Sequence, residues 1–274
     1  MLHKKITFIG AGNMASSIIS GLVKDGYPSD SICASEPNVE STDRLVQKFS
    51  IKGSQDNTAS ANWAEVIVLS VKPQIMATVC QALVDAGVDF SNKLVISIAA
   101  GISVKRLQSI LGAETAVIRT MPNTPSLLQK GMAGLFASPQ VDTANKIFAA
   151  QLMQAVGEMI WVEEESMIDA VTAASGSAPA YFFLFMEAMQ AKAKQMGFND
   201  EQAKQLVLQT ALGSVEMVAQ NPDMSIATLR ENVTSKGGTT AAALNTFNEL
   251  GLTETVAKAM QAAADRGAEM ESLF

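Results

Sequence analysis

The chain has 274 residues, of which 48% are hydrophobic and 17% are charged, and its formal net charge is −7. This length and hydrophobic content suit a globular protein of two ordinary domains. The negative charge argues against a nucleic-acid partner, because affinity for a phosphate backbone rests on Lys and Arg contacts that release counterions. No segment approaches the roughly 20 apolar residues that cross a bilayer, so we expect no membrane partner.

The first part of the chain alternates short β-branched runs with helix-length segments, which is typical of a mostly parallel sheet covered by helices. We expect strands at Ile6–Ile9, Ile32–Ser35, Val66–Ser70, Leu94–Ile98 and Ala116–Arg119, and weaker ones near 131–137 and 159–162. Helices are expected at Asn13–Lys24, Thr42–Phe49, Gln74–Ala86, Ser103–Leu111 and Asp142–Ala155. Residues 1–160 are therefore predicted to form a doubly wound α/β domain.

From about Trp161 the sequence changes to long segments rich in Ala, Met and Leu, without strand-like runs. These segments predict an all-helical domain over residues 161–274. Apolar residues such as Phe182, Phe185 and Met189 recur at the three-to-four spacing of a helix face. Helices this apolar would expose much apolar surface in so small a domain, and large exposed patches usually mark an interface. We expect a homodimer or a larger assembly.

The glycine-rich turn Gly10-Ala11-Gly12-Asn13-Met14-Ala15 directly follows an expected strand and opens an expected helix. This is the context of a dinucleotide fingerprint, in which Gly10 permits the tight turn and Gly12 lets the backbone approach a pyrophosphate. The amides at the start of the following helix favour negative charge. The turn predicts a Rossmann-type domain that binds NADP(H) or NAD(H); the alternative is a structural turn with nothing bound.

The end of the second strand bears on which of the two nucleotides is preferred. An acidic residue there accepts hydrogen bonds from the 2′-hydroxyl of NAD, whereas the 2′-phosphate of NADP prefers Arg or small hydroxyl donors. Glu36 favours NAD, while Ser35 and Asn38 favour NADP. The preference stays open at this point.

Ligands of open parallel sheets lie outside the carboxyl ends of the strands, so residues after two further strands are expected beside the nicotinamide. These residues are Val71, Lys72, Pro73, Ala99 and Ala100. For Lys72, an ordinary solvated loop lysine is an equally good interpretation.

Few side chains are suited to acid–base or metal chemistry. The only histidine is His3, ahead of the first expected strand, and no metal site is expected. Cys33 falls in an expected strand and Cys80 in an expected helix, which favours inert core thiols over a disulfide. Free thiols in turn predict a reducing cytoplasm as the location.

The scarcity of acid groups also bears on the reaction. Carbonyl reduction usually needs a proton donor, whereas a protonated C=N bond is already electrophilic, so imine reduction is favoured; Lys and Tyr side chains keep ketone reduction open.

Two segments of the helical half resemble binding loops. Ser175–Tyr181 places small residues, including Ser177, ahead of an expected helix with Pro in its first turn, although a capping loop would explain them too. The glycine-rich segment Thr234–Thr240 leads into an expected helix, and its backbone amides and hydroxyl groups can bind an anion such as a small carboxylate. Its alternative is a loop with an N-cap threonine.

At these motifs the sequence resembles the pyrroline-5-carboxylate reductase family along nearly its whole length. The matching runs are Phe8-Ile9-Gly10-Ala11-Gly12-Asn13-Met14, Val71-Lys72-Pro73, Ser97-Ile98-Ala99-Ala100-Gly101, Arg119-Thr120-Met121-Pro122-Asn123-Thr124-Pro125, Ser175-Gly176-Ser177-Ala178-Pro179-Ala180-Tyr181 and Gly237-Gly238-Thr239-Thr240. The resemblance implies reduction of 1-pyrroline-5-carboxylate to L-proline by NADPH or NADH, the last step of proline biosynthesis. It also implies a helical dimerisation domain, with dimers often assembled into larger rings.

The resemblance also implies roles for single residues. The turn residues Gly10, Gly12, Asn13 and Met14 would hold the pyrophosphate, with Ser35, Glu36 and Asn57 by the adenosine ribose and Val71, Lys72, Pro73, Ala99 and Ala100 on the nicotinamide side. On the substrate side it implies Ser177, Asp223, Gly237, Gly238, Thr239 and Thr240. Thr240 is the family's candidate for a hydrogen bond to the ring nitrogen.

The sequence departs from the family's pattern at two positions. Lys236 stands where many relatives have proline, which puts the shape of the carboxylate loop in doubt, and Glu36 replaces the neutral residues often seen there. Asp223 aligns only roughly with an acidic residue of some relatives.

Two other functions compete. One is a hydroxyacid or ketoacid reductase of similar architecture with a C-terminal lysine as the acid. The other is a non-catalytic NAD(P)-sensing module.

Overall fold

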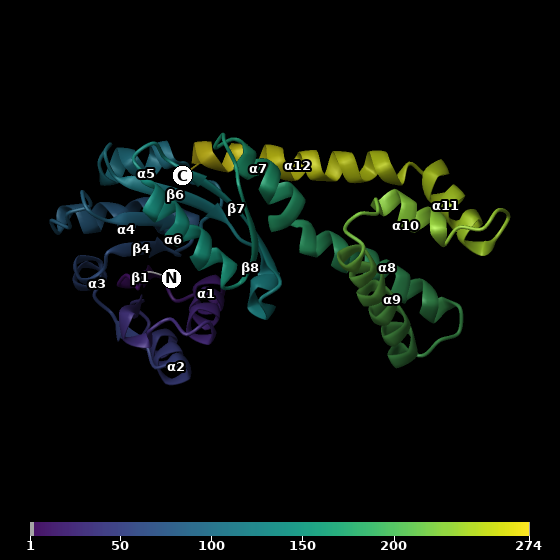
Figure 1. The fold of residues 1–274 in the computed structure, drawn as a ribbon, viewed down its shortest axis with the longest axis horizontal. Helices are drawn as coiled ribbons and strands as arrows, with labels where there is room; N and C mark the ends of the chain where they lie inside the picture. The colour runs from purple at the N-terminus through teal and green to yellow at the C-terminus, as the bar shows by residue number, and fades with distance from the viewer. Residues whose placement is uncertain (1–2, 274) are drawn as a thin grey trace. The chain divides into compact units, whose positions relative to one another are not determined.

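The computed structural model describes residues 3–273, and these pack as two compact units (Figure 1). The first unit comprises the described residues up to Pro179 together with those from Ala262 onward, and the second comprises Ala180–Gln261. The division near residue 160 follows the change in sequence pattern and stays a prediction beside these packing units.

The first unit is built on an eight-stranded sheet in the order β3-β2-β1-β4-β5-β6-β7-β8. Only the β6–β7 pair is antiparallel among these neighbours, so the predicted doubly wound, mostly parallel sheet is confirmed. The strands are β1 (Ile6–Ile9), β2 (Ile32–Ser35), β3 (Lys52–Ser54), β4 (Val66–Leu69), β5 (Leu94–Ser97), β6 (Ala116–Met121), β7 (Gly131–Ala137) and β8 (Gly157–Trp161).

Helices cover both faces of this sheet, as its continuous apolar strands require. One core cluster joins it to α1 (Asn13–Lys24), α2 (Val39–Phe49) and α6 (Thr143–Gln154). The other joins it to α3 (Asn57–Trp63), α4 (Pro73–Asp85) and α5 (Val104–Leu111). Neighbouring β1 residues serve opposite faces, since Phe8 belongs to the first cluster and Ile9 to the second.

One strand and one α-helix within residues 3–160 are absent from the predicted set. The edge strand β3 is only three residues long, and its Lys52 and Gly53 are exposed, so it carries no apolar run. Helix α3 spans seven residues and buries only Ser60 and Ala61, so it presents no apolar stripe. Pairing with β2 and packing on the sheet decide these elements, and neither leaves a local signal.

Both cysteines are buried and unbridged, as expected for core thiols. Burial raises the pKa of the Cys80 thiol to about 12, so this side chain stays protonated and unreactive at neutral pH.

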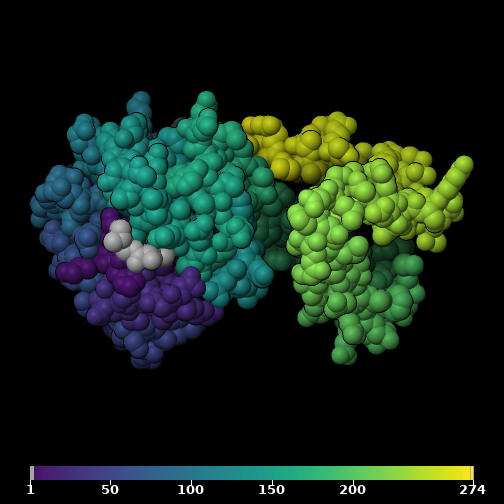
Figure 2. All heavy atoms as spheres, viewed as in Figure 1, coloured from purple at the N-terminus to yellow at the C-terminus, as the bar shows by residue number. Residues whose placement is uncertain are grey.

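The second unit is helical, as predicted for this half, and is drawn in green to yellow-green in Figure 2. It contains most of α8 (Ala178–Gln195), with α9 (Asp200–Gln220), α10 (Ile226–Asn232), α11 (Thr239–Glu249) and the start of α12 (Leu252–Leu273). Phe182, Phe183, Leu184, Leu212 and Val215 are each more than half exposed. So much exposed apolar surface marks an interface.

A buried arginine ties the last turn of α12 to the sheet of the first unit. The Arg119 side chain on β6 is 1% exposed, and its Nη1 atom lies 3.1 Å from Glu165 Oε1 and also pairs with Glu271. Its Nη2 atom lies 3.4 Å from Asp169 of α7 (Met167–Val171). Glu165 Oε1 also accepts the Val104 N–H that starts α5. The cluster thus joins segments far apart in the sequence, but places three carboxylates around one guanidinium.

The excess of carboxylates predicts how stability depends on pH. Burial, followed by the nearby Glu271 and Glu165 charges, raises the pKa of Asp169 against the opposing effect of Arg119. The folded state therefore binds this proton more tightly than the unfolded state, so stability present below the unfolded pKa is lost as pH rises through the folded pKa. We expect Asp169→Asn to raise the unfolding midpoint at about pH 7 and to change it little at about pH 4.

Thermal unfolding of both proteins across this range measures the effect, with Asp43→Asn, an exposed change on α2, as the control. A lower midpoint for Asp169→Asn at neutral pH would mean that pairing with Arg119 outweighs the carboxylate excess.

Candidate active site

The glycine-rich turn lies where the strand order reverses, because β1 has β2 on one side and β4 on the other. Gly10 has a φ of +104°, and a Cβ atom there would lie 2.8 Å from the carbonyl oxygen of Ser70. The Ser70 hydroxyl donates to the carbonyl oxygens of Ile9 at 3.0 Å and Gly10 at 2.8 Å. Only glycine fits this backbone, and the turn is held at the position where open sheets bind ligands.

Gly12 opens α1 and leaves room for a ligand. Its backbone is extended, with φ −72° and ψ −177°, and no side chain caps the helix. A Cβ atom on Gly12 would meet nothing within 4 Å. An uncapped helix N-terminus facing open space fits a pyrophosphate group, and the neighbouring Asn13 and Met14 begin the helix.

Three further predicted residues lie together with this turn at the carboxyl ends of β2 and β3. The buried Ser35 donates its hydroxyl to Asn57 Oδ1 at 2.7 Å. The Glu36 carboxylate accepts the Ala11 N–H at 3.3 Å, and the Glu36 N–H donates to the Ser54 carbonyl oxygen. Hydrogen bonds thus connect Glu36 to the glycine turn and Ser35 to Asn57.

The predicted nicotinamide-side residues follow the next two strands. Val71, Lys72 and Pro73 form the connection from β4 into α4, and the exposed Lys72 is the helix N-cap. Ala99 and Ala100 follow β5. These loops are on the same sheet edge as the glycine turn, because β1, β4 and β5 are parallel.

The end of α12 packs against the loop after β5. Gly101 has a φ of +69°, and a Cβ atom on it would lie 2.6 Å from the Cβ of Met270. The local sequence pattern around Met270 gives no sign that this residue supports the loop. The adjacent Glu271 pairs with Arg119, so both contacts fix the same helical turn.

The segment around Ser177 differs from the predicted helix start. Helix α7 runs through a π-helical turn, Thr172–Gly176, directly into α8. Pro179 has no N–H, so the Ser175 carbonyl lacks its helical donor, and Asn123 Nδ2 donates to it instead at 3.2 Å. The Ser177 N–H donates to the Thr172 carbonyl oxygen at 2.8 Å. Irregular turns of this kind are frequent at functional sites.

Asn123 is a residue whose function the sequence reasoning missed, although its motif stood out. Its Oδ1 atom accepts the Met132 N–H at 2.9 Å, and its Nδ2 atom also contacts Ser175 Oγ at 3.1 Å. Asn123 therefore joins β7 to the π-helical turn.

The second unit carries the other predicted anion loop. Gly237 has a φ of +73°, and Gly238 is the N-cap of α11 with no side-chain cap. Thr239 is exposed and Thr240 is half-buried in the first turn, while Lys236 next to the loop is exposed. The uncapped helix start suits a carboxylate. Asp223 is exposed in the connection between α9 and α10.

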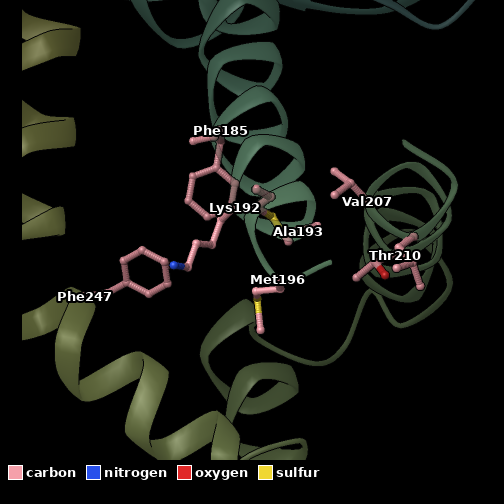
Figure 3. Close-up of a pocket in the computed structure, with 10 residues that line it drawn as sticks. Phe185, Lys192, Ala193, Met196, Val207, Thr210 and Phe247 are labelled. Atoms are coloured by element: carbon pink, nitrogen blue, oxygen red, sulfur yellow. The ribbon is translucent and has the colours of Figure 1, made fainter. Parts of the chain in front are cut away.

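A hollow in the second unit lies elsewhere on its surface. It has a volume of about 480 Å³, and its walls come from α8, α9 and α11, with the Phe185 and Phe247 rings at one side (Figure 3). Apart from Lys192 and Thr210 its lining is apolar. None of the predicted site residues lines it, and it belongs to the exposed apolar surface of these helices.

His3 lies away from the glycine turn. It precedes β1, at the opposite end of the strand, and its ring packs edge-on to Tyr27 with 5.2 Å between centroids. Within residues 3–273, no cluster of His, Cys, Asp and Glu is arranged for a metal ion. No helix in the same range is long and apolar enough to span a membrane.

Comparison with known proteins gives consistent matches over the whole chain. Residues 165–270 match the family described as pyrroline-5-carboxylate reductase dimerisation, and residues 5–101 match NADP oxidoreductase coenzyme F420-dependent. The chain is 58% identical to the pyrroline-5-carboxylate reductase of Vibrio alginolyticus and 50% identical to that of Haemophilus influenzae, covering 100% of each.

Solved structures agree with these matches. A pyrroline-5-carboxylate reductase from Coxiella burnetii is 41% identical with a TM-score of 0.91 over 98% of both chains. The Plasmodium falciparum pyrroline carboxylate reductase with NADP bound is 29% identical with a TM-score of 0.87 over 99% of both chains.

The open space at Gly12 gives a direct test of the nucleotide end. We expect Gly12→Val to weaken binding of both NADH and NADPH by at least about 10-fold, because its side chain would occupy the space at the helix start. Fluorescence titration of the purified chain measures this, and the unfolding midpoint separates it from misfolding. Unchanged affinity for both nucleotides would remove Gly12 from the site.

Proposed function

The chain belongs to the pyrroline-5-carboxylate reductase family, and we propose that it reduces 1-pyrroline-5-carboxylate to L-proline with NAD(P)H, the last step of proline biosynthesis. The observation that carries this proposal in the structure is the open, uncapped helix start at Gly12, at the point where the strand order reverses. The nucleotide, when bound, supplies the hydride.

We assign the nucleotide to the first unit. The backbone of Gly10, Ala11, Gly12, Asn13 and Met14 holds the pyrophosphate. The adenosine ribose lies at Ser35, Glu36 and Asn57, and the nicotinamide lies beside Val71, Lys72, Pro73, Ala99 and Ala100. The contacts of Ser35 with Asn57 and of Glu36 with Ala11 support this assignment.

We assign the substrate carboxylate to Gly237, Gly238, Thr239 and Thr240, with Ser177 and Asp223 beside the substrate. The uncapped amides of α11 and the first-turn hydroxyls support this assignment. The Thr240 hydroxyl accepts a hydrogen bond from the N–H of the protonated imine and so orients the ring.

The reaction needs no protein acid at the reacting carbon. A hydride adds to the carbon of the protonated C=N bond, and the π electrons of that bond become the lone pair of the product amine. Any later protonation of the amine draws on solvent. This chemistry suits a chain whose only histidine, His3, lies at the opposite end of β1.

The helical half forms a homodimer, and the apolar surface of α8, α9 and α11 provides its interface. We propose that dimers assemble further into a larger ring. We also propose a cytoplasmic location, which the two buried, unbridged cysteines support.

An absorbance assay with 1-pyrroline-5-carboxylate, run in parallel with NADH and NADPH, tests the activity. We expect loss of reduced nucleotide only when the cyclic imine is present. A ketoacid panel is the control, because turnover of ketoacids alone would favour a hydroxyacid or ketoacid reductase. Tight nucleotide binding without oxidation by any small imine would favour a sensing module.

Thr240 is tested by removing its hydroxyl. We expect Thr240→Ala to lower kcat/KM for the imine by about 10- to 100-fold, because a hydrogen bond that orients the substrate is lost, while nucleotide affinity stays within about twofold. Thr240→Ser should restore most of the activity.

Thr246→Ala is the matched control for this change. Thr246 lies later in α11, where its exposed hydroxyl donates to the Ala242 carbonyl oxygen. Turnover and KM of Thr240→Ala equal to those of this control would remove Thr240 from the site.

A further inference from the structure

The sequence leaves the choice between NADH and NADPH balanced among Ser35, Glu36 and Asn38, and the structure shows what each of these side chains does. Ser35 is fully buried, and its hydroxyl is donated to Asn57 Oδ1. Asn38 caps α2, because its Oδ1 atom accepts the N–H groups of Glu40 at 2.9 Å and Ser41 at 3.4 Å. The two side chains that favour a 2′-phosphate are therefore both engaged in holding the fold.

Glu36 is the residue of the three whose side chain faces the glycine turn. Its Oε2 atom lies 3.3 Å from the Ala11 nitrogen and accepts that N–H. Its own N–H donates to the Ser54 carbonyl oxygen at 3.0 Å, which fixes the backbone at the end of β2. A carboxylate held here accepts hydrogen bonds from ribose hydroxyls.

The surrounding charges disfavour a phosphate at the same point. Residues 36–43, after β2, contain no Lys or Arg but include Glu36, Glu40 and Asp43. Residues 53–62, from within β3 into α3, also contain no Lys or Arg, and Asp56 caps α3 there. Lys52 is placed over the Trp63 ring, 4.4 Å from its centroid.

Arg44 is the first cation after β2. It lies with Lys48 on the exposed side of α2, where both line a hollow with Asn13 and Ser16 of α1. A 2′-phosphate beside Glu36 would place two negative groups together, and like charges at short range repel.

We infer that Glu36 selects NADH over NADPH in this chain, by accepting hydrogen bonds from the ribose hydroxyls and repelling a 2′-phosphate. This selection rests on the proposed function, because it concerns the nucleotide of that same site. It deepens that function by naming the nucleotide that the chain uses.

Nucleotide binding without substrate tests the selection directly. The purified full-length chain is titrated with NADH and with NADPH, and nicotinamide fluorescence gives the two Kd values. We expect NADPH to bind the unaltered chain at least about 10-fold more weakly than NADH. In Glu36→Gln and Glu36→Ser we expect this ratio to fall by at least about 10-fold, with NADPH binding gained and NADH binding weakened.

Glu40→Gln is the matched control, because it removes the same charge from an exposed position in the first turn of α2 and should leave the ratio unchanged. Arg44→Ala examines the first cation after β2. The selection is overturned if NADPH binds the unaltered chain as tightly as NADH, or if Glu36→Gln keeps the original ratio. If NADPH binds the unaltered chain as tightly as NADH and Arg44→Ala loses NADPH binding, the 2′-phosphate is assigned to Arg44 instead.

The outcomes also separate this selection from the proposed function. If the chain discriminates between the nucleotides but does not oxidise NADH with the imine, the selection by Glu36 stands and the proposed function is overturned. If the chain reduces the imine but binds both nucleotides with equal affinity, the proposed function stands and the selection by Glu36 is overturned.

Discussion

The close approach of Gly10 to the carbonyl of Ser70 is the constraint on which the nucleotide end depends. A side chain at Gly10 would lie 2.8 Å from the Ser70 oxygen, so the turn after β1 can pass against the end of β4 only as glycine. The Ser70 hydroxyl then holds that turn through Ile9 and Gly10. The strand order reverses at this point, which is where open sheets bind ligands.

A second constraint connects this sheet edge to the end of the chain. Met270 fills the space above Gly101, and Glu271 beside it pairs with the buried Arg119. Removing Arg119 would leave three carboxylates without their cation, which is far more costly than the net gain from forming the cluster. The loop after β5, which we assign to the nicotinamide side, is thus supported by residues about 170 positions later in the chain. Local sequence pattern carries no sign of that support.

Features with a local cause in the sequence were predictable, and features that depend on distant contacts were not. Strands such as Val66–Leu69 were predictable because a sheet buried on both faces needs continuous apolar runs. Strand β3 and helix α3 were not, because pairing and packing decide them. The positions of the glycine turn and of Ser35 and Glu36 were predictable from motif and strand end, whereas Asn57 was named only through the family resemblance. Asn123 was not predictable, because its function depends on a carbonyl that Pro179 leaves without a donor.

The sequence by itself determined the mostly parallel sheet, the all-helical half, the family and the glycine turn. These features depend on hydrophobic periodicity and on local backbone freedom, and both are determined by residues that are close together in the sequence. The tertiary structure decided which side chains at the end of β2 are left to meet a ligand. The Ser35 hydroxyl is hydrogen-bonded to Asn57, and the Asn38 side chain caps α2. Of the three side chains, the Glu36 carboxylate contacts the glycine turn. The reason is that a polar side chain can serve a ligand only with the hydrogen bonds that the fold leaves it.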